Sequence, residues 1–107
     1  MRSGMTNGGP MAVYVDNMHL TEMGRFGRYR MCHMLADSTE ELLAMADRIG
    51  VDQKYIQKAG TPHEHFDIPT HRRRLAVLYG AVEITMLEAG RFVGARRKAQ
   101  EARRAAG

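Results

Sequence analysis

Short apolar segments near the start of the chain have patterns that are typical of strands. Residues 11–15 form a nearly all-apolar run with two valines and a tyrosine, as in a strand covered on both faces. Residues 28–36 alternate weakly, which predicts a second strand with His33 on one face and Cys32 on the other. Residues 19–27 contain glycine, show no periodicity and predict a loop.

Two further strands are predicted in the second half of the chain. In residues 65–68 two apolar side chains share one face, while His65 and Asp67 share the other. Residues 82–85 are rich in β-branched side chains and predict a fourth strand.

The clearest helix signal lies between residues 38 and 50. Ser38 is followed three residues later by Glu41, which is the pattern of a capping box at a helix N-terminus. Apolar side chains then recur on one helical face, and Gly50 supplies the left-handed residue that commonly ends a helix.

Two more helices are predicted toward the carboxyl end of the sequence. Thr70 is expected to cap a helix over residues 70–79. Residues 86–106 are rich in helix formers, with interruptions expected at Gly90 and Gly94.

Strands that alternate with helices predict an α/β fold. We expect a small single domain with a mostly parallel sheet of about four strands, flanking helices and a C-terminal helix. Residues 1–10 are expected to be a disordered leader, residues 11–85 the α/β domain, and residues 86–107 a basic helical tail.

The positive charge of the chain is concentrated in that tail. The sequence has 16 Lys and Arg against 12 Asp and Glu, a net charge of +4. Residues 1–85 hold ten basic and ten acidic side chains, whereas residues 86–107 hold six basic and two acidic ones. Any attraction to nucleic acid that follows from net charge therefore belongs to the tail.

Composition excludes several classes of protein. Cys32 is the only cysteine, so neither an internal disulfide nor a cysteine-rich zinc finger is available, and a reducing, cytoplasmic setting fits best. The longest uncharged apolar segment, residues 75–82, is far shorter than the roughly 18 residues that a membrane-spanning helix needs. No membrane partner is expected.

Four segments, in the same order along the chain, match a known family pattern. They are Met-Ala-Val-Tyr-Val-Asp at 11–16, His-Met-Leu-Ala-Asp at 33–37 leading into Glu-Glu-Leu, His-Phe-Asp-Ile at 65–68, and Arg-Arg-Leu-Ala at 73–76 running to Gly-Ala-Val at 80–82. Through these segments the chain resembles an uncharacterised family of bacteria and their phages that is catalogued as domain of unknown function 4031. The resemblance covers roughly residues 11–85 and implies a shared fold without an established activity.

Val-Tyr-Val-Asp-Asn at 13–17 and residues 75–85 carry a second, weaker resemblance, to metal-dependent nucleases of the PIN type. The first segment is similar to the first strand of that family, which ends in a metal-binding aspartate, and the second is similar to its closing helix and strand. That family usually has an acidic residue two positions after the threonine, where this chain has Leu87, with Glu88 one position further on.

Two aspartates follow the first two predicted strands. In a parallel sheet, Asp16 and Asp37 would both lie at the carboxyl edge, where they could hold Mg²⁺ or Mn²⁺ beside a phosphate. The alternative is that both are turn residues, Asp37 before the first helix and Asp16 beside Asn17.

A second group of candidate metal ligands lies in the histidine-rich segment. His63, His65 and Asp67 are spaced by two residues and share a face if the segment is extended, and His33 could supply a distant fourth group. Imidazole and carboxylate together suit Zn²⁺, Mn²⁺ or Fe²⁺, or a histidine base oriented by an aspartate. The residues could equally be ordinary surface histidines. The candidate catalytic residues are Asp16, Asp67 and His65.

Three arginines lie in the first turn of the second predicted helix, where acidic residues are usually favoured. This unfavourable placement suggests an anion site, unless Asp67 or Thr70 compensates. The residues are Arg72, Arg73 and Arg74, of which Arg73 matches the family pattern.

The tail carries a narrow seam of small apolar residues surrounded by basic ones. It could bind nucleic acid, pack against its own domain or a second copy of the chain, or be a solvated terminus. The seam is Phe92, Ala95, Ala99, Ala102 and Ala106, and the candidate anion-binding residues are Arg96, Arg97, Lys98, Arg103 and Arg104.

These patterns predict a small protein that binds nucleic acid or a phosphate-bearing ligand such as a nucleotide, and the family resemblance implies a phage or bacterial accessory protein in the cytoplasm of a bacterial host. One alternative is a metal-dependent phosphodiesterase or nuclease that uses a divalent Mg, Mn or Zn ion. Another is a structural or host-protein-binding oligomer built through the C-terminal helix.

Overall fold

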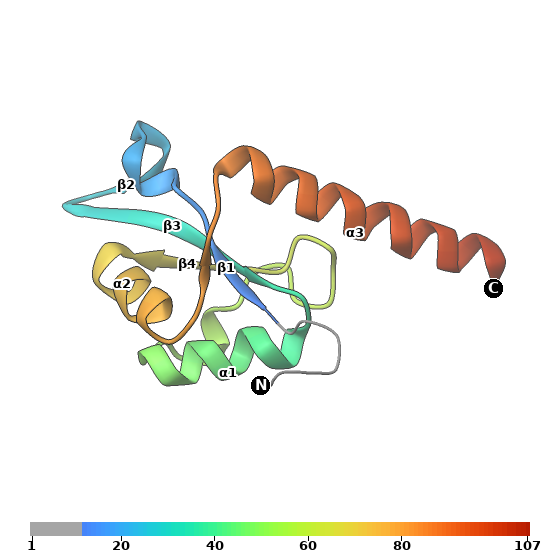
Figure 1. Cartoon of the computed structure of the whole chain (residues 1–107), viewed down its shortest axis with the longest axis horizontal. Coiled ribbons are helices and arrows are strands. Elements are labelled where there is room, and N and C mark those ends of the chain that lie inside the picture. The colour runs from blue at the N-terminus through green and yellow to red at the C-terminus, as the bar shows by residue number, and fades with distance from the viewer. Residues whose placement is uncertain (1–11) are drawn as a thin grey trace.

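The computed structural model describes residues 12–107, so the expected leader at 1–10 lies outside the described residues. Its five-stranded mixed sheet has the order β2-β3-β1-β5, with β4 paired to β3 (Figure 1). The strands are β1 (Val13–Val15), β2 (Arg25–Phe26), β3 (Tyr29–Ala36), β4 (Phe66–Pro69) and β5 (Val82–Glu83). The predicted α/β class is therefore confirmed.

The directions of the strands differ from the prediction. Only β1 and β5 are parallel, while β3 runs antiparallel to β1, β2 and β4. The connection from β1 to β3 contains no crossover helix, which a parallel pair would require. It contains the two short 3-10 helices η1 (Met18–Leu20) and η2 (Glu22–Gly24), and then β2, which forms a hairpin with β3. Residues 19–27, expected as a loop, therefore contain the fifth strand.

The three α-helices lie close to their predicted positions. Helix α1 (Thr39–Ile49) begins at Ser38, whose side chain accepts a hydrogen bond from the Glu41 amide, and ends at Gly50 with a φ of 80°. Helix α2 (Thr70–Leu78) has Pro69 at its N-cap, so the expected capping role of Thr70 is wrong. Helix α3 (Met86–Ala106) runs without interruption through both of its glycines. A third 3-10 helix, η3, spans Gln53–Tyr55.

The two faces of the sheet are covered differently. Helices α1 and α2 lie on one side of the sheet, while α3 starts on the other side and projects away from it (Figure 1). Alternate residues of β3 explain this division, since Cys32, Met34 and Ala36 belong to the core beneath α1 and α2, whereas His33 and Leu35 line a pocket beside α3. None of the helices among residues 12–107 has the length and apolar character that a bilayer crossing requires.

Several contacts fix the carboxyl ends of β1 and β5, where the chain approaches α3. Arg73 donates from Nε to the carbonyl of Asp16 and from Nη1 to Glu83, each at 3.0 Å. Asn17 accepts from the amide of Met86, the first residue of α3. Thr85 caps that helix in a complete capping box with Glu88. These bonds place α3 over the sheet face that carries His33.

Gly24 sets the packing of the 3-10 segment against β3. A Cβ atom added there would lie 2.5 Å from the carbonyl oxygen of Met18 and 2.6 Å from that of Met31. No larger residue fits without moving backbone, so the close approach of this segment to the sheet requires glycine.

Candidate metal centre between the sheet and helix α3

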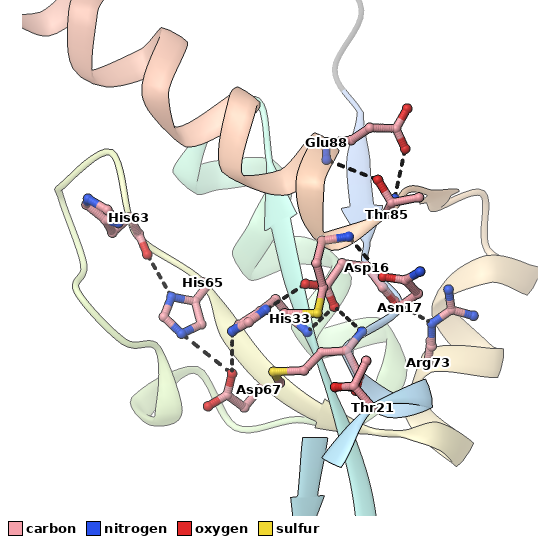
Figure 2. Close-up of polar contacts among 12 residues, drawn as sticks. Asp16, Asn17, Thr21, His33, His63, His65, Asp67, Arg73, Thr85 and Glu88 are labelled. Carbon is pink, nitrogen blue, oxygen red and sulfur yellow. Dashed lines mark hydrogen bonds and ion pairs between the residues drawn. The ribbon is translucent and has the colours of Figure 1, made fainter. Parts of the chain in front are cut away.

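Four polar side chains from different segments converge on the face of the sheet that α3 covers (Figure 2). His33 on β3 pairs in register with Asp67 on β4, and His65 precedes β4 in an isolated bridge with Gln57. Asp16 follows β1 directly. One possible ligand atom from each of His33, His65 and Asp67 lies within 4.8 Å of the others. The antiparallel register therefore brings together residues that are far apart in the sequence.

Asp16 orients the His33 ring. Its carboxylate is fully buried, and Oδ1 accepts from the backbone amides of His33 at 2.9 Å and Met18 at 3.1 Å. Its Oδ2 lies 2.6 Å from Nδ1 of His33. We assign the hydrogen to Nδ1, because an ionised carboxylate can only accept. Neutral His33 then presents the lone pair of Nε2 toward Asp67.

His65 is oriented in the same way by a backbone carbonyl. Its Nδ1 lies 2.7 Å from the carbonyl oxygen of His63, which can only accept, so the ring nitrogen Nε2 again carries the lone pair. The Nε2 atoms of His65 and His33 lie 3.5 and 3.8 Å from the same oxygen, Oδ1 of Asp67. Gln57 donates to the other oxygen of Asp67 at 2.7 Å. Three atoms that could bind a metal ion therefore lie close together.

The buried aspartate and its histidine shift each other's ionisation. Burial alone would raise the pKa of Asp16, but the hydrogen bonds from the His33 side chain and from the backbone amides of His33 and Met18 outweigh it and lower that pKa. The hydrogen bond to Asp16 raises the pKa of His33 above its ordinary value, against the opposing effect of burial. A proton therefore competes for the Nε2 atom of His33 more strongly than it does for an isolated imidazole.

The donor set suits a divalent transition metal. Two imidazoles and one carboxylate form a common ligand set for Zn²⁺, Mn²⁺ or Fe²⁺, whereas Mg²⁺ prefers oxygen ligands. Histidine metal ligands usually donate a hydrogen bond from their second ring nitrogen to a carboxylate or a carbonyl. His33 and His65 have such partners at Nδ1. Asp16 would thus hold a ligand in place rather than bind the ion.

The cluster opens into a pocket of about 420 Å³ between the sheet, the loop before β4 and helix α3. His33, His65 and Asp16 lie on its sheet side, and small or apolar residues of α3 form the opposite wall. Lys58 and Arg97 supply the positive charge of its rim, where Nη2 of Arg97 lies 2.6 Å from Nε2 of His63. The pocket therefore combines possible metal ligands with groups that attract an anion.

Asp37 lies away from this cluster, so the expected shared edge with Asp16 is wrong. Strands β1 and β3 are antiparallel, which puts their carboxyl ends at opposite edges of the sheet. Asp37 accepts from the Tyr14 hydroxyl and the Ala12 amide at the amino end of β1. Its observed contacts are structural.

Two of the three arginines at the start of α2 also have structural contacts. Arg72 donates to the carbonyl of Ile49 at the end of α1, and Arg73 binds Asp16 and Glu83 as described above. Arg74 is exposed. The guanidinium of Arg72 lies at the C-terminus of α1, where a positive charge is favourable.

The arginines of α3 divide between the body of the protein and solvent. Arg96 donates to the Ala36 carbonyl at 3.2 Å and lies 3.8 Å from the buried carboxylate of Glu64, while Arg97 reaches the pocket rim. Further along, Lys98, Arg103 and Arg104 are exposed. Helix α3 is therefore part of the domain at its start and a basic projection at its end (Figure 1).

The structure adds residues that sequence reasoning missed. Gln57 orients Asp67, and Lys58 reaches the pocket from a turn in which its φ is 54°, a left-handed value that is uncommon outside glycine. Glu64 is buried and fixes the loop before β4 by accepting from Thr39 and Gly60. No local pattern marks these residues, since their roles depend on how this loop folds against β3 and α1.

A comparison with known protein families matches most of the chain to one family. One family model, described as "Protein of unknown function (DUF4031)", matches residues 13–96. The chain belongs to this family. The part that matches the DUF4031 family contains all four cluster residues and the first half of α3, and it ends before Lys98. The resemblance to the DUF4031 family is thus confirmed.

The other comparisons add no relative to this DUF4031 protein. Neither the curated proteins nor the solved structures give a match. The weaker resemblance to PIN-type nucleases has no support from these comparisons, and Glu88 is engaged in the capping box of α3. The activity must therefore be argued from the site itself.

Proposed function

We propose that this DUF4031 protein is a divalent-metal-dependent hydrolase of phosphate esters. The observation that carries the proposal is the convergence of the His33 and His65 Nε2 atoms on Oδ1 of Asp67, beside a pocket that the two histidines line and that has Lys58 and Arg97 on its rim. A metal held by these ligands would keep open coordination positions facing the pocket. The charged rim favours a substrate with a negative charge.

The chemistry expected of such a site is a simple hydrolysis. A divalent ion lowers the pKa of a bound water and so supplies a nucleophile near neutral pH. The water oxygen forms a bond to phosphorus, the bond between phosphorus and the ester oxygen breaks, and the leaving oxygen takes up a proton while the water loses one. Lys58 and Arg97 would hold the phosphate oxygens and stabilise the developing charge.

Metal binding is tested first by thermal unfolding with Zn²⁺, Mn²⁺ or Mg²⁺. At a metal concentration 100 times the dissociation constant, binding adds about 2.7 kcal/mol to the stability, enough to raise the melting temperature by several degrees. We expect Zn²⁺ or Mn²⁺ to stabilise the wild type, and the exposed control His71→Asn, but not His65→Asn or Asp67→Asn. If none of the three ions raises the melting temperature of the wild type, the proposal is overturned.

Hydrolysis is tested with 4-nitrophenyl phosphate and bis(4-nitrophenyl) phosphate, which release a coloured product. We expect release that requires the metal, falls in Asp67→Asn and weakens in Lys58→Asn, with Lys54→Asn as a charge-matched control outside the pocket. Asparagine is chosen at position 58 because it tolerates the left-handed backbone. Metal binding without release of product would overturn the proposed hydrolase activity. It would favour the binding module that the sequence predicts.

A second candidate function is nucleic-acid binding by the end of α3. Residues 101–107 are exposed, and no ion pair joins Lys98, Arg103 or Arg104 to another residue between 12 and 107. Cations that remain available in this way would give binding that weakens steeply with salt. Fluorescence anisotropy with labelled DNA and RNA should therefore show weaker binding for a chain that ends at residue 97. Equal affinity at low salt would exclude this role for the tail.

The alanine seam of α3 supports self-association as the alternative use of the same helix. Ala95, Ala99, Ala102 and Ala106 are all exposed in the single chain. Association through this seam predicts a mass that rises with protein concentration in light scattering and returns to that of a monomer when residues 98–107 are removed. A constant monomer mass would exclude it.

A further inference from the structure

Two glycines leave a bare strip of helix on the wall of the pocket that faces the candidate metal ligands His33 and His65. Gly90 and Gly94 lie one turn apart on α3, and both line the pocket. A Cβ atom added at either position would meet nothing within 4 Å. Packing among the described residues therefore does not require glycine there, although glycine costs about 1 kcal/mol relative to alanine inside a helix.

The strip is bordered by apolar side chains. Met86 and Val93 on α3 and Leu35 on β3 line the same pocket. Its polar part consists of Asp16, His33, Lys58, His63, His65 and Arg97. A ligand that fits both parts needs an anionic group at one end and a flat apolar group at the other. A pocket of about 420 Å³ falls at the lower end of the roughly 300–1,000 Å³ that hold small molecules, which suits one nucleotide and excludes a duplex.

We propose that the pocket binds a single nucleotide unit. Its phosphate lies between the candidate metal ligands and the side chains of Lys58 and Arg97, and its base lies against Gly90 and Gly94. The inference rests on the proposed function for the position of the phosphate. The absence of side chains at the two glycines lets a planar ring approach the helix backbone closely. The unit is either a free nucleoside monophosphate or the phosphorylated end of a single strand.

The direct test uses calorimetry with ligands that the protein cannot cleave. Adenosine and uridine 5′-methylenephosphonates carry a carbon atom in place of the ester oxygen, and methylphosphonate and the free nucleosides represent the two halves. With Mn²⁺ present, we expect the nucleotide analogues to bind at least ten times more tightly than either half. Binding no tighter than that of methylphosphonate would overturn the proposal.

A pair of substitutions on α3 tests the glycine strip itself. Gly94→Leu fills the space against which the base would lie, while Ala105→Leu adds similar bulk at an exposed position of the same helix outside the alanine seam. We expect Gly94→Leu to lose at least ten-fold in affinity for the nucleotide analogues and to keep its affinity for methylphosphonate and its stabilisation by metal. Ala105→Leu should behave as the wild type. Unchanged nucleotide binding in Gly94→Leu would also overturn the proposal.

The source of the nucleotide and the role of the metal are separated by two further arms. A five-nucleotide strand with a terminal phosphate that binds more tightly than the mononucleotide analogue indicates a strand end, and the reverse order indicates a free nucleotide. Nucleotide binding that persists in EDTA while no metal stabilises the protein would refute the proposed hydrolase and leave the nucleotide pocket standing. Stabilisation by metal without nucleotide preference would do the opposite.

Discussion

The Oδ2 atom of Asp16 lies 2.6 Å from Nδ1 of His33, and this contact determines which ring nitrogen faces Asp67. Asp16 is buried and anionic, so it accepts the Nδ1 hydrogen and leaves Nε2 with a lone pair. The orientation of a potential metal ligand therefore depends on a residue that need not touch the metal.

Asp16→Asn should weaken metal binding although it removes no ligand. With its oxygen still accepting from the amides of His33 and Met18, the new NH₂ group would donate to Nδ1 and move the ring hydrogen to Nε2. Loss of such an orienting partner typically lowers metal affinity by about 10–100-fold. Calorimetric titration with Zn²⁺ measures the change, and the exposed Glu101→Gln provides the control. Wild-type affinity in Asp16→Asn would show that the contact does not orient His33.

The same pair predicts opposite effects of pH on stability and on metal binding. The pKa of His33 is raised on folding, so its contribution to stability is complete below its ordinary value of 6.5 and is lost as pH rises through the raised pKa. The pKa of Asp16 is lowered, so its contribution is complete above the ordinary 3.8 and is lost as pH falls through the lowered pKa. The metal-free protein should gain most from this pair between about pH 4 and 6.5.

Metal affinity should increase over the range in which that stability falls. The ion needs the unprotonated Nε2 of His33, so a rise from pH 6 to 8 should strengthen Zn²⁺ binding. Urea unfolding in EDTA and Zn²⁺ titration at the same pH values measure the two trends, and Asp16→Asn should flatten the first. Parallel trends would contradict the assigned ionisation.

Alanine should have opposite effects at two glycines. Gly24→Ala places a Cβ atom 2.5–2.6 Å from two backbone carbonyl oxygens, and we expect it to lower the free energy of unfolding by about 1–3 kcal/mol. Gly90→Ala enters open space on a helix and should raise it by about 0.5–1 kcal/mol. Urea unfolding measures both. Equal effects of the two substitutions would contradict the packing described for Gly24.

Shortening α3 at two positions should separate its two halves. Removal of residues 98–107 leaves the contact of Phe92 with Tyr14 and the bond from Arg96 to Ala36, so stability should change by no more than about 0.5 kcal/mol. A chain that ends at Thr85 loses these contacts and the buried Ala89, and should be destabilised by about 2 kcal/mol or more. Chemical unfolding of both chains checks the difference, and equal stabilities would show that α3 does not belong to the domain.

Local signals explain which parts of the fold could be predicted. The Ser38 and Gly50 signals defined α1 because caps act within one helical turn. The alternation in β3 likewise placed His33 and Cys32 on opposite faces. Strand direction depended on the connection through η1, η2 and β2, which lacks periodicity, so the expected parallel arrangement was wrong.

The candidate site was predictable in its residue types and not in its assembly. His65 and Asp67 stood out by their spacing, but their partnership with His33 depends on the antiparallel register of β3 and β4. Asp37 was grouped with Asp16 only because a parallel sheet was expected. Lys58 and the open space beside Gly94 arise from tertiary structure and leave no local trace.

The alternation along β3 also determines which substitutions this protein can accept during evolution. Its even-numbered residues Cys32 and Met34 hold the core together, and its odd-numbered residues His33 and Leu35 shape the pocket. Substitutions in one set can accumulate with little effect on the other, so the scaffold is free to acquire a new ligand without being rebuilt. The loss or gain of a single residue within this strand would exchange the two sets, so that core side chains would face the pocket and His33 would face the core.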